Sequence, residues 1–362
     1  MGWIGIGDHE GGQFDARGLA RASLDAPQVA TGGIALRGTL LIETHVSPEG
    51  RPQTLLAFER AHPWSGHLSL QMLPSGGIVL VDTLGDDLRH AAVMHDLDGR
   101  SDQLRVSYSW DAPAKLGRLA LEHLSQGRIH SVAVPHPHPM LMDDLRMITR
   151  YPTRRDMDAD VGFLAVSDRV EPLGPMPGLT AHVPIATPRG DVPAGRLRRG
   201  DTVLTSAGEV VPILHTVRQT VPARGSLRPV VLRAPFFGLT RDILLAPHQR
   251  LVIGGSQVEY MFGTEAALVP ARHLVNGASA YYGEGPDLVT YHHLLLPGHQ
   301  AILAAGCPVE SLYIGRLRRD PAALAGSVLA GLDRARLPEH PRPIWPVLKP
   351  FEAVTLAMTR AA

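Results

Sequence analysis

The sequence contains a single cysteine, Cys307, and its 35 basic residues are balanced by 35 acidic ones. One cysteine excludes an internal disulfide framework and any metal site built from several cysteines. A formal net charge of zero removes the electrostatic footprint of a protein that follows a phosphate backbone, so we expect no nucleic-acid partner. The apolar runs are only a few residues long, and we therefore expect no helix that spans a membrane and no membrane partner.

The N-terminal segment 1–12 has neither a basic start nor a long apolar stretch, so we expect no ordinary secretory signal. A cytoplasmic location is then the default, and export without a leader stays open. The oligomeric state is open as well.

Turn-forming residues are abundant, with 37 glycines and 31 prolines among 362 residues. This composition favours short strands and many turns over helix. The length suggests two domains. We expect a mainly β protein with an N-terminal antiparallel β-sandwich of the jelly-roll kind, a compact all-β domain after it, and a short helical, proline-rich C-terminal tail.

Hydrophobic alternation with a period of two marks the first half of the chain. It is clearest over 104–110, where every second residue from Leu104 to Trp110 is apolar and the others are polar. Such alternation predicts half-buried strands, and we see no sustained helical period in this half. The predicted strands cover 39–46, 54–59, 67–72, 78–82, 104–110, 118–122, 130–134 and 144–148.

A stretch rich in proline and glycine, 170–178, divides the chain, because it suits neither a helix nor a sheet interior. We expect a lectin-like sandwich at 1–165, a linker at 166–177, a second β domain at 178–318, and a helix with a docking tail at 319–362. The second domain has short apolar runs at 202–205, 210–215, 230–233, 243–245, 250–253, 292–296 and 300–303. A helix is predicted over 321–332 with Asp320 as N-cap, and Trp345, Leu348 and Phe351 are expected to dock the tail.

Four blocks of the second domain occur in a recognisable order. They read IATPRGDVPAGRLRRGDTVL at 185–204, LVPARHLVNG at 268–277, YHHLL at 291–295 with His299 just beyond, and ESLYIG at 310–315. Together they closely resemble the Hint (hedgehog/intein) domain of alphaproteobacterial proteins. The resemblance covers about residues 178–315 and implies a compact all-β Hint fold.

Active Hint domains cleave the peptide bond at their own N-terminus. A Cys or Ser at the first position attacks the preceding carbonyl, and a Thr-x-x-His element, or Ser-Pro-x-His in the bacterial branch, helps to protonate the departing nitrogen. The reaction needs a nucleophile, a proton donor and oxyanion stabilisation held together, because an amide is a poor electrophile.

This chain departs from that pattern at each aligned position. The nucleophile position is Gly178, the hydroxyl residue is Ala246, and the histidine position is Gln249. His248 stands one residue early, and on a strand a shift of one residue points a side chain to the opposite face. We therefore expect a degenerate autoprocessing site.

Other residues of the domain are candidates for residual chemistry. Thr180 lies two positions after Gly178, although a strand threonine that bonds the backbone is the simpler interpretation. His273, His293 and His299 lie near the expected site in sequence, where we expect histidines that bond backbone carbonyls. We expect no metal and no cofactor, and the resemblance gives Cys307 no role.

The N-terminal strand pattern resembles the concanavalin-like jelly roll of laminin-G type, carried by segments 38–44, 56–59, 68–71 and 104–110. That resemblance implies a recognition module for a glycan or a protein, sometimes with calcium. Asp96, Asp98 and Asp102 are candidate calcium ligands, although turn formation explains them more simply. Trp64 is a candidate platform for a sugar ring, and we expect Trp110 in the core.

Three functional hypotheses follow. The first is a binding or scaffold protein without enzymatic activity, in which the sandwich recognises a partner and the Hint domain is silent. The second is a self-cleaving protein that releases its N-terminal domain near Gly178. The third is a metal-dependent hydrolase that uses the histidines of the second domain.

Overall fold

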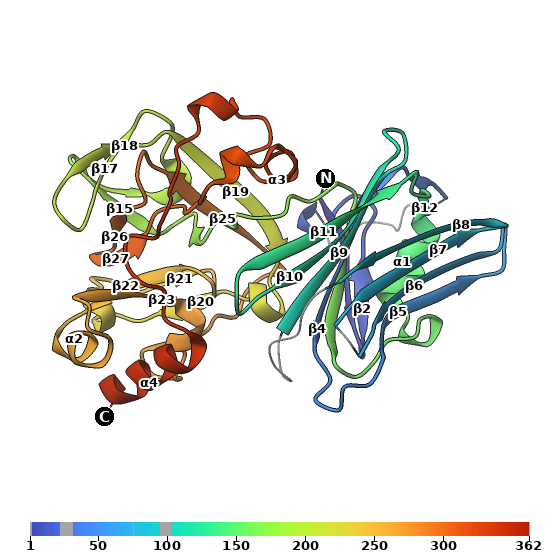
Figure 1. Cartoon of the computed structure of the whole chain (residues 1–362), viewed down its shortest axis with the longest axis horizontal. Helices are drawn as coiled ribbons and strands as arrows, with labels where there is room; N and C mark the ends of the chain where they lie inside the picture. The colour runs from blue at the N-terminus through green and yellow to red at the C-terminus, as the bar shows by residue number, and fades with distance from the viewer. Residues whose placement is uncertain (1, 22–31, 75, 95–102, 362) are drawn as a thin grey trace. The chain divides into compact units, whose positions relative to one another are not determined.

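The computed structural model describes residues 2–21, 32–74, 76–94 and 103–361. The chain divides into two compact units, the first made of Met1–Glu171 with Arg224–Ser226 and the second of Pro172–Ala223 with Leu227–Ala362. Both units are mainly β, and the first is an antiparallel sandwich, which confirms the fold class expected from the sequence (Figure 1).

The first unit is built from two sheets. The larger sheet has the strand order β11-β10-β9-β4-β13-β1-β2, the smaller one has the order β5-β6-β7-β8, and β3 pairs with β12. The elements are β1 (Trp3–Asp8), β2 (Gly11–Phe14), η1 (Leu19–Arg21), β3 (Ile34–Ala35), β4 (Arg37–His45), β5 (Gln53–Arg60), β6 (Gly66–Met72), β7 (Ile78–Leu84), β8 (Asp87–Val93), β9 (Gln103–Asp111), β10 (Leu116–His123), β11 (Arg128–Pro135), β12 (Met140–Leu141), α1 (Met142–Arg150), η2 (Pro152–Arg154) and β13 (Val161–Ser167).

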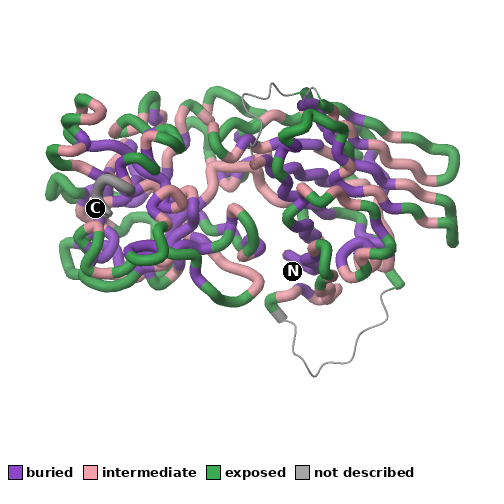
Figure 2. Tube along the Cα trace, turned by 90° about the horizontal axis from the view of Figure 1, so that it is seen from below, coloured by how far each residue is buried: buried purple, intermediate pink, exposed green. Residues whose placement is uncertain are grey.

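The core of the sandwich comes from alternate residues of these strands. Tyr108 and Trp110 on β9 are completely buried, and Leu119 of β10 and Leu40 of β4 lie opposite Tyr108. The Trp110 indole Nε1 donates to the carbonyl of Ala35 at 2.9 Å, so its polar atom is satisfied inside the core. Figure 2 shows buried residues in purple along the strands of the first unit.

The strand predicted over 144–148 is wrong, and so is the expectation that this half contains no helix. These residues belong to α1, whose buried positions include Leu145, Ile148 and Thr149. Spacings of three and four residues are the helical period, and the Thr149 hydroxyl donates to the carbonyl of Leu145 at 2.8 Å. A window of five residues is too short for the two periods to be told apart.

The second unit contains two six-stranded sheets and a small hairpin. The sheet orders are β19-β25-β14-β21-β20-β24 and β16-β15-β26-β27-β22-β23, with β17 paired to β18. The elements are β14 (Leu179–Thr180), β15 (Pro184–Thr187), β16 (Gly190–Pro193), η3 (Ala194–Arg196), β17 (Thr202–Leu204), β18 (Val210–Pro212), β19 (His215–Pro222), η4 (Gly225–Leu227), β20 (Val230–Leu232), η5 (Phe236–Gly238), β21 (Ile243–Leu245), β22 (Arg250–Gly254), α2 (Ser256–Phe262), β23 (Ala266–Pro270), η6 (Ala271–Leu274), β24 (Ala280–Tyr282), β25 (Leu288–Leu295), β26 (Ala301–Ala304), β27 (Cys307–Glu310), η7 (Leu317–Arg319), α3 (Pro321–Ala325), η8 (Arg334–Arg336) and α4 (Pro350–Ala361).

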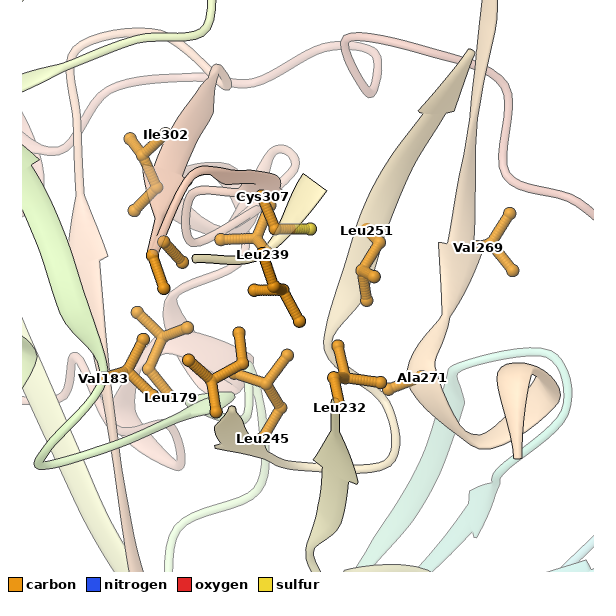
Figure 3. Close-up of a cluster of buried hydrophobic side chains, with 14 of the residues drawn as sticks. Leu179, Val183, Leu232, Leu239, Leu245, Leu251, Val269, Ala271, Ile302 and Cys307 are labelled. Carbon is orange, nitrogen blue, oxygen red and sulfur yellow. The ribbon is translucent and has the colours of Figure 1, made fainter. Parts of the chain in front are cut away.

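The core of the second unit lies between these sheets and is made of aliphatic side chains. Leu179, Leu245 and Leu251 are fully buried in it, and Figure 3 shows Cys307 among them. Burial raises the pKa of the Cys307 thiol to about 12, so this cysteine is a small apolar core residue. Each fully buried leucine contributes about 1.5–3 kcal/mol relative to an exposed one.

The C-terminal part has a shorter helix than the sequence predicted. Asp320 caps α3 as expected, since its Oδ1 accepts from the Ala323 amide at 2.9 Å, but the helix ends at Ala325 and not at 332. The Ser327 hydroxyl donates to the carbonyl of Leu324 at 2.8 Å, a local bond that competes with helix continuation. Of the expected docking residues Leu348 is buried, whereas Phe351 is 67% exposed.

In the part of the chain that the structure describes, no helix is both long and apolar enough to cross a membrane.

Candidate functional site

Gly178 directly precedes β14, which lies between β25 and β21 in its sheet. Leu179 of β14 pairs with Leu245 of β21 on one side and with His292 of β25 on the other. Because both pairings are antiparallel, the residue before Leu179 meets the residues that follow Leu245 and His292. The topology therefore brings Ala246 and His293 to Gly178, and the Pro177–Gly178 peptide bond is buried there.

Two backbone groups of Gly178 are bound by these neighbours. Its carbonyl accepts from the Ala246 amide at 2.8 Å, and its amide donates to Nδ1 of His293 at 3.0 Å. The residue at the aligned hydroxyl position thus contributes only its backbone, because alanine has no group that donates or attacks.

Gln249 covers Gly178 with its side chain. The amide Nε2 donates to the carbonyls of Arg250 and Glu310, both at 3.2 Å, which orients Oε1 away from those two acceptors. Oε1 has no hydrogen-bond partner among the described residues, and a Cβ built on Gly178 would lie only 2.0 Å from it. The Gln249 side chain therefore occupies the space in which a nucleophile at position 178 would begin.

His293 is the imidazole nearest the Pro177–Gly178 bond. Its Nδ1 accepts from Gly178, so Nε2 carries the proton and donates to the Glu310 carbonyl at 3.0 Å. Burial lowers the pKa of His293 to about 4, which leaves the ring neutral near physiological pH. His293 therefore accepts a hydrogen bond from the Gly178 amide nitrogen and has no proton on Nδ1 to donate to it.

A buried charged cluster supports the same strand ends. Oε2 of Glu310 lies 3.1 Å from Nη1 of Arg250 and 3.2 Å from Nε2 of His299. Burial alone would raise the pKa of Glu310, but the adjacent His299 ring and the charge of Arg250 outweigh it and hold the pKa below its usual value. The cluster fixes the Glu310 backbone, whose carbonyl binds both Gln249 and His293.

The other candidates lie around the site without completing it. The Thr180 hydroxyl donates to the Leu244 carbonyl at 2.8 Å, so it is engaged with the backbone. His248 lies in a turn and not on the strand that we expected, and its Nε2 lies 3.2 Å from the Met176 carbonyl. His273 lies in η6, where burial lowers its pKa to about 4.

Sequence reasoning identified the aligned positions but missed the charged cluster behind them. Arg250 follows Gln249 directly in the motif, and Glu310 opens the last block, so both stood beside residues already singled out. Across the described parts of the chain, no group of three His, Cys, Asp or Glu side chains is placed to hold a metal ion. Asp96, Asp98 and Asp102, the candidate calcium ligands, lie outside the described residues.

The sequence of the second unit matches a known domain family. Residues 177–316 match the Hint domain family. The chain therefore carries a Hint domain preceded by a β-sandwich, as the four sequence blocks and the alternation pattern predicted. No curated protein matches the sequence.

Three solved structures illustrate what this chain is similar to. The MchDnaB-1 intein is 14% identical, with a TM-score of 0.27, and the match covers 36% of this chain and 98% of the intein. The CBM40 of the Ruminococcus gnavus IT-sialidase, bound to alpha2,6 sialyllactose, is 15% identical with a TM-score of 0.25, covering 36% and 75%. Tailspike protein 2 from Escherichia coli O157:H7 bacteriophage CAB120 is 13% identical with a TM-score of 0.25, covering 38% and 20%.

Proposed function

We propose that this chain is a binding protein in which the sandwich recognises a partner and the Hint domain is a catalytically silent scaffold. The proposal that the Hint domain is silent rests on the contact at Gly178, where the Gln249 side chain fills the space that a nucleophilic side chain would occupy. Part of this proposal is that the domain is of the alphaproteobacterial type in a degenerate form, with Ala246-Pro-His-Gln249 in place of Ser-Pro-x-His.

The contacts at this site support the absence of a nucleophile and of a proton donor. Residue 178 has no side chain to attack, and the nearby Thr180 hydroxyl is bonded to a backbone carbonyl. His293 is neutral and accepts from the amide nitrogen, so it is not a general acid for that nitrogen. Attack by water needs access, and the Pro177–Gly178 bond is buried.

The test is the intact mass of the recombinant full-length chain after several days with and without dithiothreitol or hydroxylamine. We expect one species at full length under every condition. A pair of fragments that divide between residues 177 and 178 would contradict the proposal. The self-cleaving alternative predicts that pair, and the imidazole at the Gly178 amide is the observation in its favour.

The sandwich half of the proposal rests on the exposed end of the smaller sheet. Trp64 lies in the loop between β5 and β6 and is 58% exposed, whereas Trp110 is fully buried. An exposed indole is the usual platform for an apolar sugar face. The Arg60 guanidinium donates to the Trp64 carbonyl at 2.9 Å and holds the loop at the strand end.

Polar side chains adjoin this loop on the outer face of the smaller sheet. Glu59, His67 and Thr83 lie opposite one another across β5, β6 and β7. Nδ1 of His67 is 3.5 Å from Oε1 of Glu59, whose side chain is 84% exposed. An aromatic platform beside exposed acceptors and donors suits hydroxyl groups on a glycan, which is the partner class that we propose, with a protein as the alternative. The concanavalin-like character of the sandwich and the boundary near residue 165 remain part of this proposal.

The metal-dependent hydrolase ranks last. Its histidines are engaged with backbone groups, as His293 is with Gly178 and Glu310. His299 accepts from the Ile344 amide through Nδ1. A stoichiometric metal in the purified chain, lost when His299 is changed to Ala, would favour it over the silent scaffold.

A further inference from the structure

The C-terminal strap, residues 338–350, is held on the second unit by a reciprocal pair of histidines. His340 belongs to the strap, and its Nδ1 accepts from the amide of Ile314 at 3.4 Å. His299 belongs to the body of the unit, and its Nδ1 accepts from the amide of Ile344 in the strap at 2.9 Å. Each side thus offers one imidazole lone pair to an amide of the other.

This arrangement requires both rings to be neutral. A lone pair on Nδ1 places the proton on Nε2 in each ring. Nε2 of His340 lies 3.3 Å from the Leu296 carbonyl, which accepts its proton, and Nε2 of His299 lies 3.2 Å from Oε2 of Glu310 without the alignment of a hydrogen bond. The two ring centroids are 5.9 Å apart, and Tyr313 lies against both rings.

Beyond the histidines the strap covers the edge of a sheet. β23 is the last strand of its sheet, and Leu268 in it donates to the Pro346 carbonyl at 2.8 Å and accepts from the Leu348 amide at 3.0 Å. Val347 thereby forms a parallel bridge with Leu268, and the Leu348 side chain is buried in the core. The strap satisfies backbone groups that an open edge would expose.

We infer that the strap is an acid-released clasp, which protonation of His340 opens to uncover the edge of β23. A proton on Nδ1 of His340 would point at the Ile314 N–H, so two donors would face each other where a hydrogen bond had been. The inference concerns the second unit alone and does not rest on the proposed function.

The surroundings of His340 oppose a proton on its Nδ1. It is buried, and its neighbours are the Ile314 amide, the Leu296 carbonyl and the rings of His299 and Tyr313. The adjacent Glu339 is turned to Arg318 and Arg319. Burial lowers the pKa of His340 from its usual 6.5, and the charge of a protonated His299 would lower it further.

The surroundings of His299 differ, because Glu310, itself paired with Arg250, faces its Nε2. His299 holds its half of the clasp through the Ile344 amide.

The sign of the pH dependence follows from linkage. A histidine whose pKa is lower in the docked state than in the released state holds the strap above its ordinary pKa and loses that hold as the pH falls. Each titrating ring multiplies the opening constant by up to about tenfold per pH unit below about 6.5.

The experiment is amide hydrogen exchange of the full-length chain, read as protection of Ile344 and Leu348 relative to unstructured peptides at the same pH. We expect protection at both amides to fall several-fold, by up to about tenfold, between about pH 7.5 and 5.5. Leu251 in the core strand β22 exchanges through unfolding of the whole unit, so the strap amides, which exchange through local opening, should be less protected than Leu251 at both pH values. Equal protection of the strap amides at both pH values would overturn the inference.

Variants separate the clasp from general acid sensitivity. Asparagine keeps an acceptor near the Nδ1 position without titrating, so His340→Asn should weaken the pH dependence and His299→Asn with His340→Asn should abolish it. His182→Asn, at an exposed position of the same unit, is the matched control and should behave as the wild type. A double variant with the wild-type pH dependence would refute the inference. If the variants fail to fold, an NMR titration of the His340 C2 proton in the wild-type chain provides the test. A pKa of His340 at or above 6.5 would also refute the inference.

Discussion

The side-chain oxygen Oε1 of Gln249 lies 2.0 Å from the position that a Cβ on Gly178 would occupy. The φ angle of Gly178 lies outside the left-handed region, so the backbone does not require glycine there. What requires glycine is the neighbouring side chain. A side chain at position 178 and glutamine at position 249 therefore exclude one another.

The coupling predicts a non-additive pair of substitutions. Gly178→Ala should lower the free energy of unfolding by about 1–3 kcal/mol, because the new methyl group overlaps Gln249 in a packed interior. Adding Gln249→Ala removes that overlap, although the new Cβ would still lie 3.0 Å from the Cβ of residue 249. The double variant should be more stable than the sum of the single changes by about 1 kcal/mol or more. Urea unfolding of the four proteins measures this.

Gly285→Ala is the matched control for that cycle. Gly285 lies in the same unit with nothing within 4 Å of an added Cβ, so its substitution should change the unfolding free energy by no more than about 0.5 kcal/mol. Strict additivity of Gly178→Ala and Gln249→Ala would show that the two side chains do not exclude one another.

His293 gives the second unit a defined sensitivity to acid. Its pKa is about 4 in the folded chain against 6.5 ordinarily, because the ring is buried. The neutral ring therefore contributes stability above pH 6.5 that is lost as the pH falls towards 4, amounting to about 2–3 kcal/mol at about pH 4.5. His293→Asn should flatten this part of the pH dependence of unfolding, measured by urea titration at several pH values.

His293→Asn will also change the unfolding free energy at neutral pH. The test compares only how steeply that free energy changes with pH in each variant. The exposed His182→Asn variant should retain the wild-type slope. An unchanged slope in His293→Asn would mean that the ring is not held neutral by the fold.

Cys307 should be inert while the chain is folded. The thiol is completely buried, and its pKa of about 12 leaves almost no thiolate near neutral pH. We expect no reaction with a thiol reagent such as Ellman's reagent in buffer, and one thiol per chain in denaturant. Full labelling of the native chain within minutes would contradict the burial of this residue.

The strands of the sandwich were predictable because their apolar residues recur with a period of two. Leu104, Val106 and Tyr108 are buried in the core as this period predicts, but the polar residues between them, Arg105 and Ser107, are buried as well, which the alternation did not indicate. α1 was not predictable in the same way, because its buried residues Leu145 and Ile148 give a single helical spacing within a short segment.

The candidate site was predictable as a set of positions but not as a set of contacts. Alignment singled out Gly178 and Gln249 separately, and only the folded chain shows that one side chain fills the space of the other. Glu310 and Arg250 were missed because a charge beside apolar strand residues is indistinguishable, in one sequence, from a solvated strand end. His248 was expected on a strand, and the turn at Pro247 explains its different direction.

Substitution of Trp64 should affect ligand binding by the sandwich without affecting its stability. The side chain is 58% exposed, so Trp64→Ala should change the unfolding free energy by no more than about 0.5 kcal/mol. If a glycan stacks on the indole, the same change should weaken its binding at least about tenfold, the equivalent of about 1.4 kcal/mol. A glycan array identifies the ligand, and calorimetric titration then compares the variants.

Two further variants define the footprint of that ligand. Glu59→Gln and Thr83→Ala lie on the same outer face as His67 and should weaken binding with little effect on stability, because their side chains are not in the core. Leu116→Ala, in the larger sheet and 69% exposed, is the matched surface control and should bind as the wild type does. Binding that survives Trp64→Ala and Glu59→Gln but fails with Leu116→Ala would move the recognition site away from the β5–β6 loop.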